Sequence, residues 1–101
     1  MTKSISLING EFKETISVYD RGLSYGDGLF ETMLWHKESG GKPIFFIEYW
    51  KRHIIRLRKG CKILKIPSPN LDVLEKFRKN KLKKSYNKGL ENGILKVLLT
   101  R

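Results

Sequence analysis

The chain has 101 residues, of which 40% are hydrophobic and 11% aromatic, so it is long enough for one domain with a core and too apolar for bulk disorder. Lysine and arginine number 21 against 10 acidic residues, and the net charge of +11 raises the question of a polyanionic partner. The single cysteine, Cys61, excludes an intrachain disulfide and a cysteine-built zinc site. Neither a secretory signal nor an apolar run of 18 residues is found, so we expect a cytoplasmic protein without a membrane partner.

The first element expected is a β-hairpin. Residues Ser4–Ile8 alternate polar and apolar side chains, and a second run with strand character covers 11–18. Asn9-Gly10 lies between them, and this dipeptide is typical of two-residue hairpin turns.

A glycine-rich loop follows, with three glycines and two aspartates between Asp20 and Leu29. We interpret Asp20 and Asp27 as turn residues that bond to their own backbone. The apolar run Leu29–His36 predicts a strand, and Pro43–Ile47 predicts a second one after a turn. Together with the first hairpin, these strands predict one antiparallel sheet.

Two helices are expected in the second half of the chain. A helix over about Glu48–Lys65 would bury one face, composed of Trp50, Ile54, Leu57, Cys61 and Leu64. Asn70 is a good N-cap for a second helix, which is dense in lysine and precedes a loop over 87–93. The apolar run 93–101 predicts a final strand. The fold class expected is therefore α+β, an antiparallel sheet with two helices packed on one face.

Candidate binding residues lie on one flank of the first helix. His53, Arg56 and Gly60 are three and four residues apart, beside the apolar face. A half-sheltered arginine at Arg56 could bind a phosphate or a carboxylate. Spacing alone favours a structural role over an anion-binding one. In the structural role, the arginine extends along the edge of the core and Gly60 merely permits helix–sheet packing.

Other chemistry is not indicated. His36 is expected to face solvent, and the two histidines have no metal-binding spacing. Asp20, Asp27 and Glu31 do not form a convincing carboxylate pair, and no nucleophilic triad or phosphate-binding loop is present.

The basic segment Arg78–Lys84 carries five lysine or arginine residues and is the strongest local signal for a polyanion. Such a run more often forms a lysine-rich helix face in contact with solvent than a binding site for a polyanion. Lysines outnumber arginines 15 to 6, whereas contacts to bases and phosphates favour arginine. Nucleic acid is therefore the less favoured partner.

Several motifs in a fixed order resemble a known family. They are Asp20-Arg21-Gly22, Gly26-Asp27-Gly28-Leu29-Phe30-Glu31-Thr32, and His53-Ile54-Ile55-Arg56-Leu57 followed by Gly60-Cys61. With Leu7–Gly10 before them and Leu95–Arg101 after them, they resemble the N-terminal half of class IV pyridoxal-phosphate enzymes.

The resemblance implies roles for individual residues. Arg56 matches the arginine that binds the phosphate of pyridoxal 5'-phosphate. Phe30 and Thr32 match positions that line the substrate pocket. His53 precedes the arginine as in the family and is also expected in that pocket, with a less defined role. No catalytic residue and no metal ligand is carried over.

Within the family, the segments Arg56–Cys61 and Phe30–Thr32 look most like aminodeoxychorismate lyase. The implied reaction converts 4-amino-4-deoxychorismate to 4-aminobenzoate and pyruvate, a step of folate biosynthesis. A branched-chain or D-amino acid aminotransferase is the alternative within the family. A small basic nucleic-acid-binding module is the alternative outside it.

Family enzymes hold the cofactor between two domains, and the lysine that bonds to it lies in the C-terminal domain. None of the 15 lysines present matches that motif. We therefore expect residues 1–101 to be a truncated form, the small N-terminal domain alone, without covalently bound cofactor and inactive by itself. The expected partners are a small-molecule substrate, the C-terminal domain and, in the complete enzyme, a second subunit of a homodimer.

Overall fold

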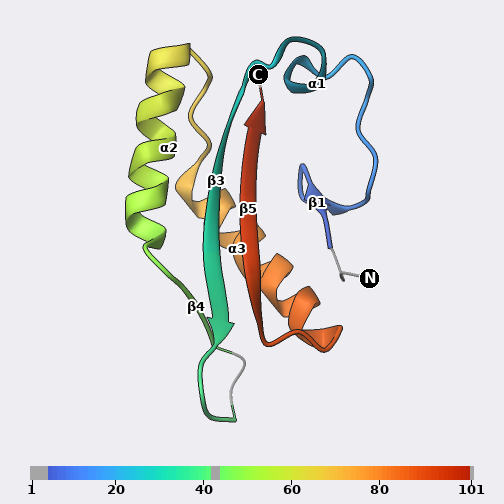
Figure 1. The fold of residues 1–101 in the computed structure, drawn as a ribbon, viewed down its shortest axis with the longest axis vertical. Helices are drawn as coiled ribbons and strands as arrows, with labels where there is room; N and C mark the ends of the chain where they lie inside the picture. Colours follow the sequence, from blue (N-terminus) through green and yellow to red (C-terminus); the bar gives the residue numbers. More distant parts are fainter. Residues whose placement is uncertain (1–4, 42–43, 101) are drawn as a thin grey trace.

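The computed structural model describes residues 5–41 and 44–100, which form a three-stranded antiparallel sheet, a separate hairpin and three helices (Figure 1). The elements in chain order are β1 (Leu7–Ile8), β2 (Glu11–Phe12), α1 (Arg21–Tyr25), β3 (Gly28–Lys37), β4 (Phe45–Ile47), α2 (Trp50–Leu64), α3 (Leu71–Asn87) and β5 (Asn92–Thr100). Within the described ranges, no helix combines the length and the apolar character needed to cross a bilayer.

Strand β3 is the centre of the main sheet, whose order is β4-β3-β5. Its pairing with β5 runs from Gly28 opposite Thr100 to His36 opposite Asn92. Because side chains alternate along a strand, the residues of β3 divide between two faces with different surroundings.

One face of the sheet is covered by α2 and α3. The core cluster on this face joins Met33 and Trp35 of β3 to neighbouring strands and to α3, and it consists of Met33, Trp35, Ile47, Leu82 and Leu95. Helix α2 adds three buried residues of its own, Ile54, Leu57 and Cys61. The expected α+β class, with two helices on one face of an antiparallel sheet, is confirmed.

The other face of the sheet is apolar but exposed. Phe30 lies opposite Leu98, and Leu34 lies opposite Ile94. All four side chains are more than half exposed, at 62%, 63%, 55% and 68% respectively.

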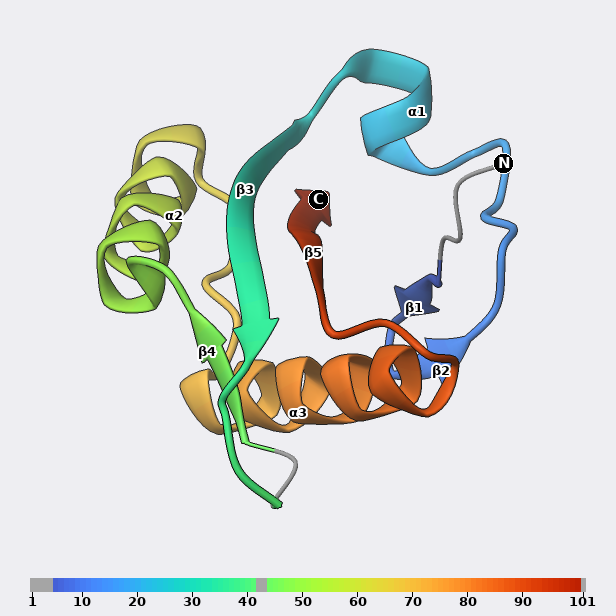
Figure 2. The ribbon, with the colours of Figure 1, turned by 60° about the horizontal axis from the view of Figure 1, so that its bottom comes forward.

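The expected hairpin forms at Asn9-Gly10, where both residues have positive φ, at 51° and 85°. Two positive φ values match the type I′ turn that joins twisted strands. The prediction that this hairpin belongs to the main sheet is wrong. Strands β1 and β2 have two residues each and form their own sheet. The hairpin lies instead near α3, where the Phe77 ring is 3.2 Å from an ideal Cβ built on Gly10 (Figure 2).

The glycine-rich loop contains a short helix, α1, that the sequence did not indicate. Asp20 caps it, since its carboxylate accepts a hydrogen bond from the Gly22 backbone N–H at 2.9 Å, as expected of a turn residue. Gly26 ends it in the left-handed conformation, with φ of 70°. Asp27 differs from its expected role, because its carboxylate accepts a hydrogen bond from Arg21 Nε at 2.8 Å.

Helix α2 is slightly shorter than expected and ends differently. Leu64, predicted to be buried, is exposed, and Ile66 is buried in its place. The cause is Lys65, which adopts φ of 56° and reverses the chain, so that Ile66 N–H donates to the Cys61 carbonyl at 2.9 Å.

Helix α3 has the N-cap predicted from the sequence. The Asn70 side chain accepts hydrogen bonds from the backbone N–H groups of Asp72 and Val73, at 2.8 and 3.2 Å. The helix continues to Asn87, so the loop before β5 is shorter than the one expected. Strand β4 begins two residues later than predicted, and Pro43 lies outside the described residues.

Candidate functional site

A buried carboxylate lies at the contact between β3 and α2. Strand alternation places Glu31 on the same face as Met33 and Trp35, and it is only 4% exposed. Acidic side chains are almost never fully buried unless they are paired. The partners of Glu31 come from α2.

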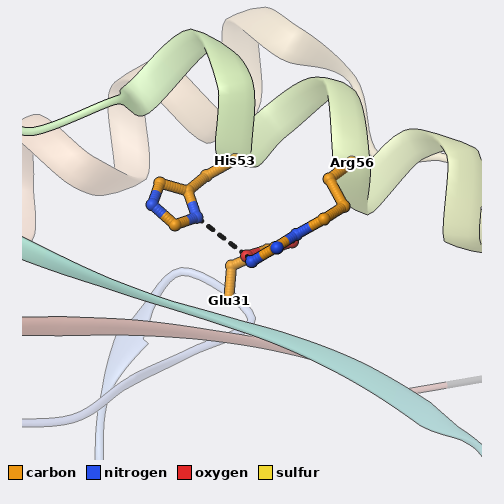
Figure 3. Close-up of polar contacts among 3 residues, drawn as sticks. All are labelled: Glu31, His53 and Arg56. Atoms are coloured by element: carbon orange, nitrogen blue, oxygen red, sulfur yellow. Dashed lines mark hydrogen bonds and ion pairs between the residues drawn. The ribbon is translucent and has the colours of Figure 1, made fainter.

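Two side chains of α2 contact this carboxylate (Figure 3). Arg56 donates from Nε to Oε1 at 2.7 Å and from Nη2 to Oε2 at 2.5 Å. The His53 Nδ1 atom lies 2.8 Å from Oε2. His53 and Arg56 can both reach Glu31 because residues three apart lie on the same side of a helix.

The contacts fix the charge of Glu31. The hydrogen bond from Arg56 lowers the pKa of the Glu31 carboxyl to about 2, against the opposing effect of burial and with a further contribution from His53. The ionised carboxylate can only accept hydrogen bonds, so His53 carries a proton on Nδ1 and donates it. The pKa of Arg56 is raised, first by its hydrogen bond to Glu31.

Arg56 itself faces outward. Its side chain is 73% exposed, more than the half-sheltered position expected from spacing, although two of its nitrogens are bound to Glu31. His53 is more enclosed, at 18% exposed.

An open depression of about 260 Å³ lies beside this cluster. It is lined by Tyr49, Arg52, His53 and Arg56. Its lining includes two arginines and a histidine, and none of the lining residues is acidic. This donor set suits an anion such as a phosphate or a carboxylate, which guanidinium groups bind through paired N–H donors.

The other predicted site residues lie across the sheet from this depression. Phe30 and Thr32 point to the exposed face of β3, opposite to the face of Glu31. The Lys96 ammonium lies 4.8 Å from the centre of the Phe30 ring. The structure therefore brings His53 and Arg56 together and separates them from Phe30 and Thr32, whose role in a substrate pocket stays a prediction.

Gly60 serves helix–sheet packing. A Cβ built on it would come within 2.9 Å of Leu29 Cδ1, so its absence allows α2 to approach β3 closely. This contact agrees with the helix–sheet packing role that spacing alone favours for Gly60. In the described part of the chain, no three histidine, cysteine, aspartate or glutamate side chains gather in a way that would hold a metal ion.

Glu31 is the site residue that sequence reasoning missed. Glu31 is named above within a family-like motif and as a weak candidate for a carboxylate pair, but without a partner. The available signal was its place in the alternation Glu31, Met33, Trp35, where a charged residue occupies a position on the buried side of a strand. Such a residue needs a cationic partner, and the next helix carries two candidates.

Comparison with known proteins shows what this arrangement is similar to. No family model matches the chain. A solved structure of a hypothetical aminotransferase from Mycobacterium tuberculosis, in its PLP-bound form, aligns with a TM-score of 0.77 over 96% of this chain and 33% of that one, at 19% identity. The structure of 4-amino-4-deoxychorismate lyase from Pseudomonas aeruginosa aligns with a TM-score of 0.66 over 92% of this chain and 30% of that one, at 34% identity.

The chain has the fold of the N-terminal domain of class IV pyridoxal-phosphate enzymes. The first match is below a quarter identity and shows the fold alone. The second combines the fold with substantial sequence identity. The chain spans about a third of the length of each of these two structures.

Proposed function

We propose that this chain is the phosphate-binding side of a class IV pyridoxal-phosphate enzyme, most like 4-amino-4-deoxychorismate lyase. The reaction would convert 4-amino-4-deoxychorismate to 4-aminobenzoate and pyruvate. Support comes from the 34% identity to the Pseudomonas aeruginosa lyase over 92% of the chain. A bound pyridoxal phosphate would supply the electron sink that this chemistry needs.

The single observation that carries the proposal is the outward-facing guanidinium of Arg56. It lines the depression together with Arg52 and His53, and its inner side is bound to Glu31. A phosphate monoester carries two negative charges and needs several N–H donors, and this donor set fits that requirement.

The rest of the active site would come from other parts of the enzyme. None of the 15 lysines matches the family's cofactor-bonding lysine, so we propose that a C-terminal domain supplies it. Phe30 and Thr32 would line the substrate pocket once another part of the enzyme covers the exposed face of the sheet. In this proposal the complete enzyme is a homodimer.

The direct test is the substitution Arg56→Ala in the complete enzyme. Losing a charge-assisted contact to the phosphate should weaken cofactor binding by about 2 kcal/mol, or roughly 30-fold. The matched control is Arg58→Ala, which removes the same charge from an exposed position of α2. Equal cofactor affinity in both variants would reject the assignment of Arg56.

A second test uses the chain as it stands. Residues 1–101 are incubated with pyridoxal phosphate, reduced with borohydride, and mapped by peptide mass spectrometry. We expect only scattered, substoichiometric modification among the 15 lysines. Full occupancy at one lysine would contradict the assignment of that lysine to another domain.

An aminotransferase of the same family is the second candidate. The match to the Mycobacterium tuberculosis protein, with a TM-score of 0.77, favours keeping it. The two activities differ in their products. A lyase releases 4-aminobenzoate and pyruvate in equal amounts, whereas an aminotransferase needs an amino-group acceptor.

The nucleic-acid alternative has less support. In the basic segment Arg78–Lys84, Arg78 is paired with Glu75 at 2.6 Å, and Lys84 lies 5.2 Å from the Phe12 ring. Tight binding to duplex DNA or RNA that falls steeply between two salt concentrations would revive this alternative.

A further inference from the structure

The Arg56 guanidinium has two edges, and Glu31 occupies one of them. A guanidinium carries five N–H donors in a fixed plane. Glu31 accepts from Nε and from Nη2, which form the inner edge. The edge formed by Nη1 and the second Nη2 hydrogen is not used by Glu31. It is the paired donor edge that binds phosphate oxygens side by side.

Glu31 is itself held firmly. It lies on the central strand of the sheet, opposite Val97 of β5, and is 4% exposed. Arg56, by contrast, extends from a helix surface with its side chain 73% exposed. An exposed arginine without a partner samples many rotamers. The conformational entropy lost when such a side chain is ordered by a ligand weakens the binding of that ligand.

We propose that Glu31 is a positioning residue for phosphate binding: it orders Arg56 in advance, so that the outer edge of the guanidinium is presented to a phosphate monoester. The same carboxylate accepts the Nδ1 proton of His53, which leaves Nε2 as the ring nitrogen turned away from Glu31 (Figure 3). This inference rests on the proposed function, because it takes Arg56 as the phosphate-binding residue.

Simple electrostatics predicts the opposite effect for Glu31. A carboxylate near the depression repels an anion, so its removal should strengthen phosphate binding if Arg56 kept its place. The sign of the change in affinity therefore separates the two roles. Weaker binding after the removal of this negative charge can come only from the loss of order or of structure.

The experiment measures the binding of pyridoxine 5'-phosphate to the chain at fixed ionic strength. This compound carries an alcohol in place of the reactive aldehyde, so it cannot bond covalently to lysines. Binding is followed by NMR of the arginine Nε–H groups, and unphosphorylated pyridoxine is the ligand control. For Glu31→Gln we expect affinity to fall by about three- to tenfold, because Arg56 must then be ordered on binding.

The matched control is Glu75→Gln. Glu75 also accepts hydrogen bonds from an arginine, with Arg78 Nε at 2.9 Å, but it does not line the depression. This variant changes the net charge by the same amount, so its affinity should be unchanged or slightly higher. Unchanged or tighter binding in Glu31→Gln as well would overturn the positioning role.

A further variant, Glu31→Asp, tests the positioning role without a change in net charge, and circular dichroism checks that the variant folds. Glu31→Asp keeps the negative charge but withdraws the carboxylate by one methylene. We expect weaker phosphate binding and a shifted Arg56 Nε–H signal in the ligand-free state, with an unchanged circular dichroism spectrum. Wild-type affinity in a folded Glu31→Asp variant would also refute the inference.

The Arg56→Ala variant in the same binding assay distinguishes this inference from the proposed function. If Arg56→Ala binds pyridoxine 5'-phosphate as well as the wild type does, Arg56 is not the phosphate ligand and both proposals fail. If Arg56→Ala weakens binding and Glu31→Gln does not, only the positioning role of Glu31 fails.

Discussion

The Glu31 carboxylate should make the stability of the domain depend on pH. Its pKa falls from 4.5 to about 2 in the folded protein, with the Arg56 hydrogen bond as the largest cause. Because the folded-state pKa is the lower one, ionised Glu31 stabilises the folded state above pH 4.5. That stabilisation is lost as the pH falls through the interval from 4.5 to about 2.

The size of the effect follows from the same pKa change. A fall from 4.5 to about 2 corresponds to an upper limit of about 3 kcal/mol in the free energy of unfolding. Solvent screens part of this interaction, because the Arg56 side chain is 73% exposed, so we expect about 2 kcal/mol. The substitution Glu31→Gln should therefore lower the free energy of unfolding by this amount at pH 7, and the difference should shrink toward pH 2.

Two measurements check this prediction. Urea denaturation followed by tryptophan fluorescence reports on Trp35, which is 4% exposed in the core. The ¹³C resonance of the Glu31 carboxyl gives its pKa directly. As a control, Glu11→Gln removes a carboxylate whose side chain is 76% exposed and should change stability by less than about 0.5 kcal/mol. A Glu31 carboxyl that titrates near 4.5, or a loss in Glu31→Gln that is the same at pH 7 and pH 2, would refute the reasoning.

Three further predictions concern the fold, and thermal denaturation checks each of them. Gly28→Ala should destabilise the domain by about 1–3 kcal/mol, because the new Cβ would lie 2.9 Å from the Leu99 carbonyl oxygen. The control Gly41→Ala should be neutral, since a Cβ there meets nothing within 4 Å. Equal effects of the two substitutions would contradict the steric argument. Asn70→Ala should cost about 1 kcal/mol through loss of the α3 N-cap, and no loss would show that the cap is dispensable. Leu82→Ala should cost about 2–5 kcal/mol because that side chain is 1% exposed, and a smaller cost would mean that the core collapses into the cavity.

Local signals predicted much of the fold. The Asn9-Gly10 turn, the Asn70 cap and the strand over Leu29–His36 each depend on a few neighbouring residues, and all three are present in the structure. The separate hairpin could not be predicted in the same way, because strand partners are chosen by long-range packing. The short helix α1 was hidden because its ends are marked by the same Asp20 and Gly26 that also mark turns.

The candidate site was only partly predictable. Helical spacing correctly placed His53 and Arg56 on one flank of α2, since that relation is internal to one element. Their common partner lies 25 residues before Arg56, on another element, and only the packing of α2 against β3 reveals it. Alternation along a strand already requires Phe30 and Thr32 to lie on the other face from Glu31. That Arg56 lies on the Glu31 face, however, follows only from the packing of α2 against β3.

The pairing of β3 with β5 has a consequence for the synthesis of this domain. Gly28 pairs with Thr100, so the first residue of the central strand has a partner that is translated 72 residues later. Until β5 has left the ribosome, one edge of the longest strand stays open, and the apolar side chains along it have no neighbour on that side. Long-range strand pairing is slow and exposes nascent chains to aggregation. We therefore expect this domain to fold only after β5 has left the ribosome, and chains that stall before Asn92 to depend on chaperones.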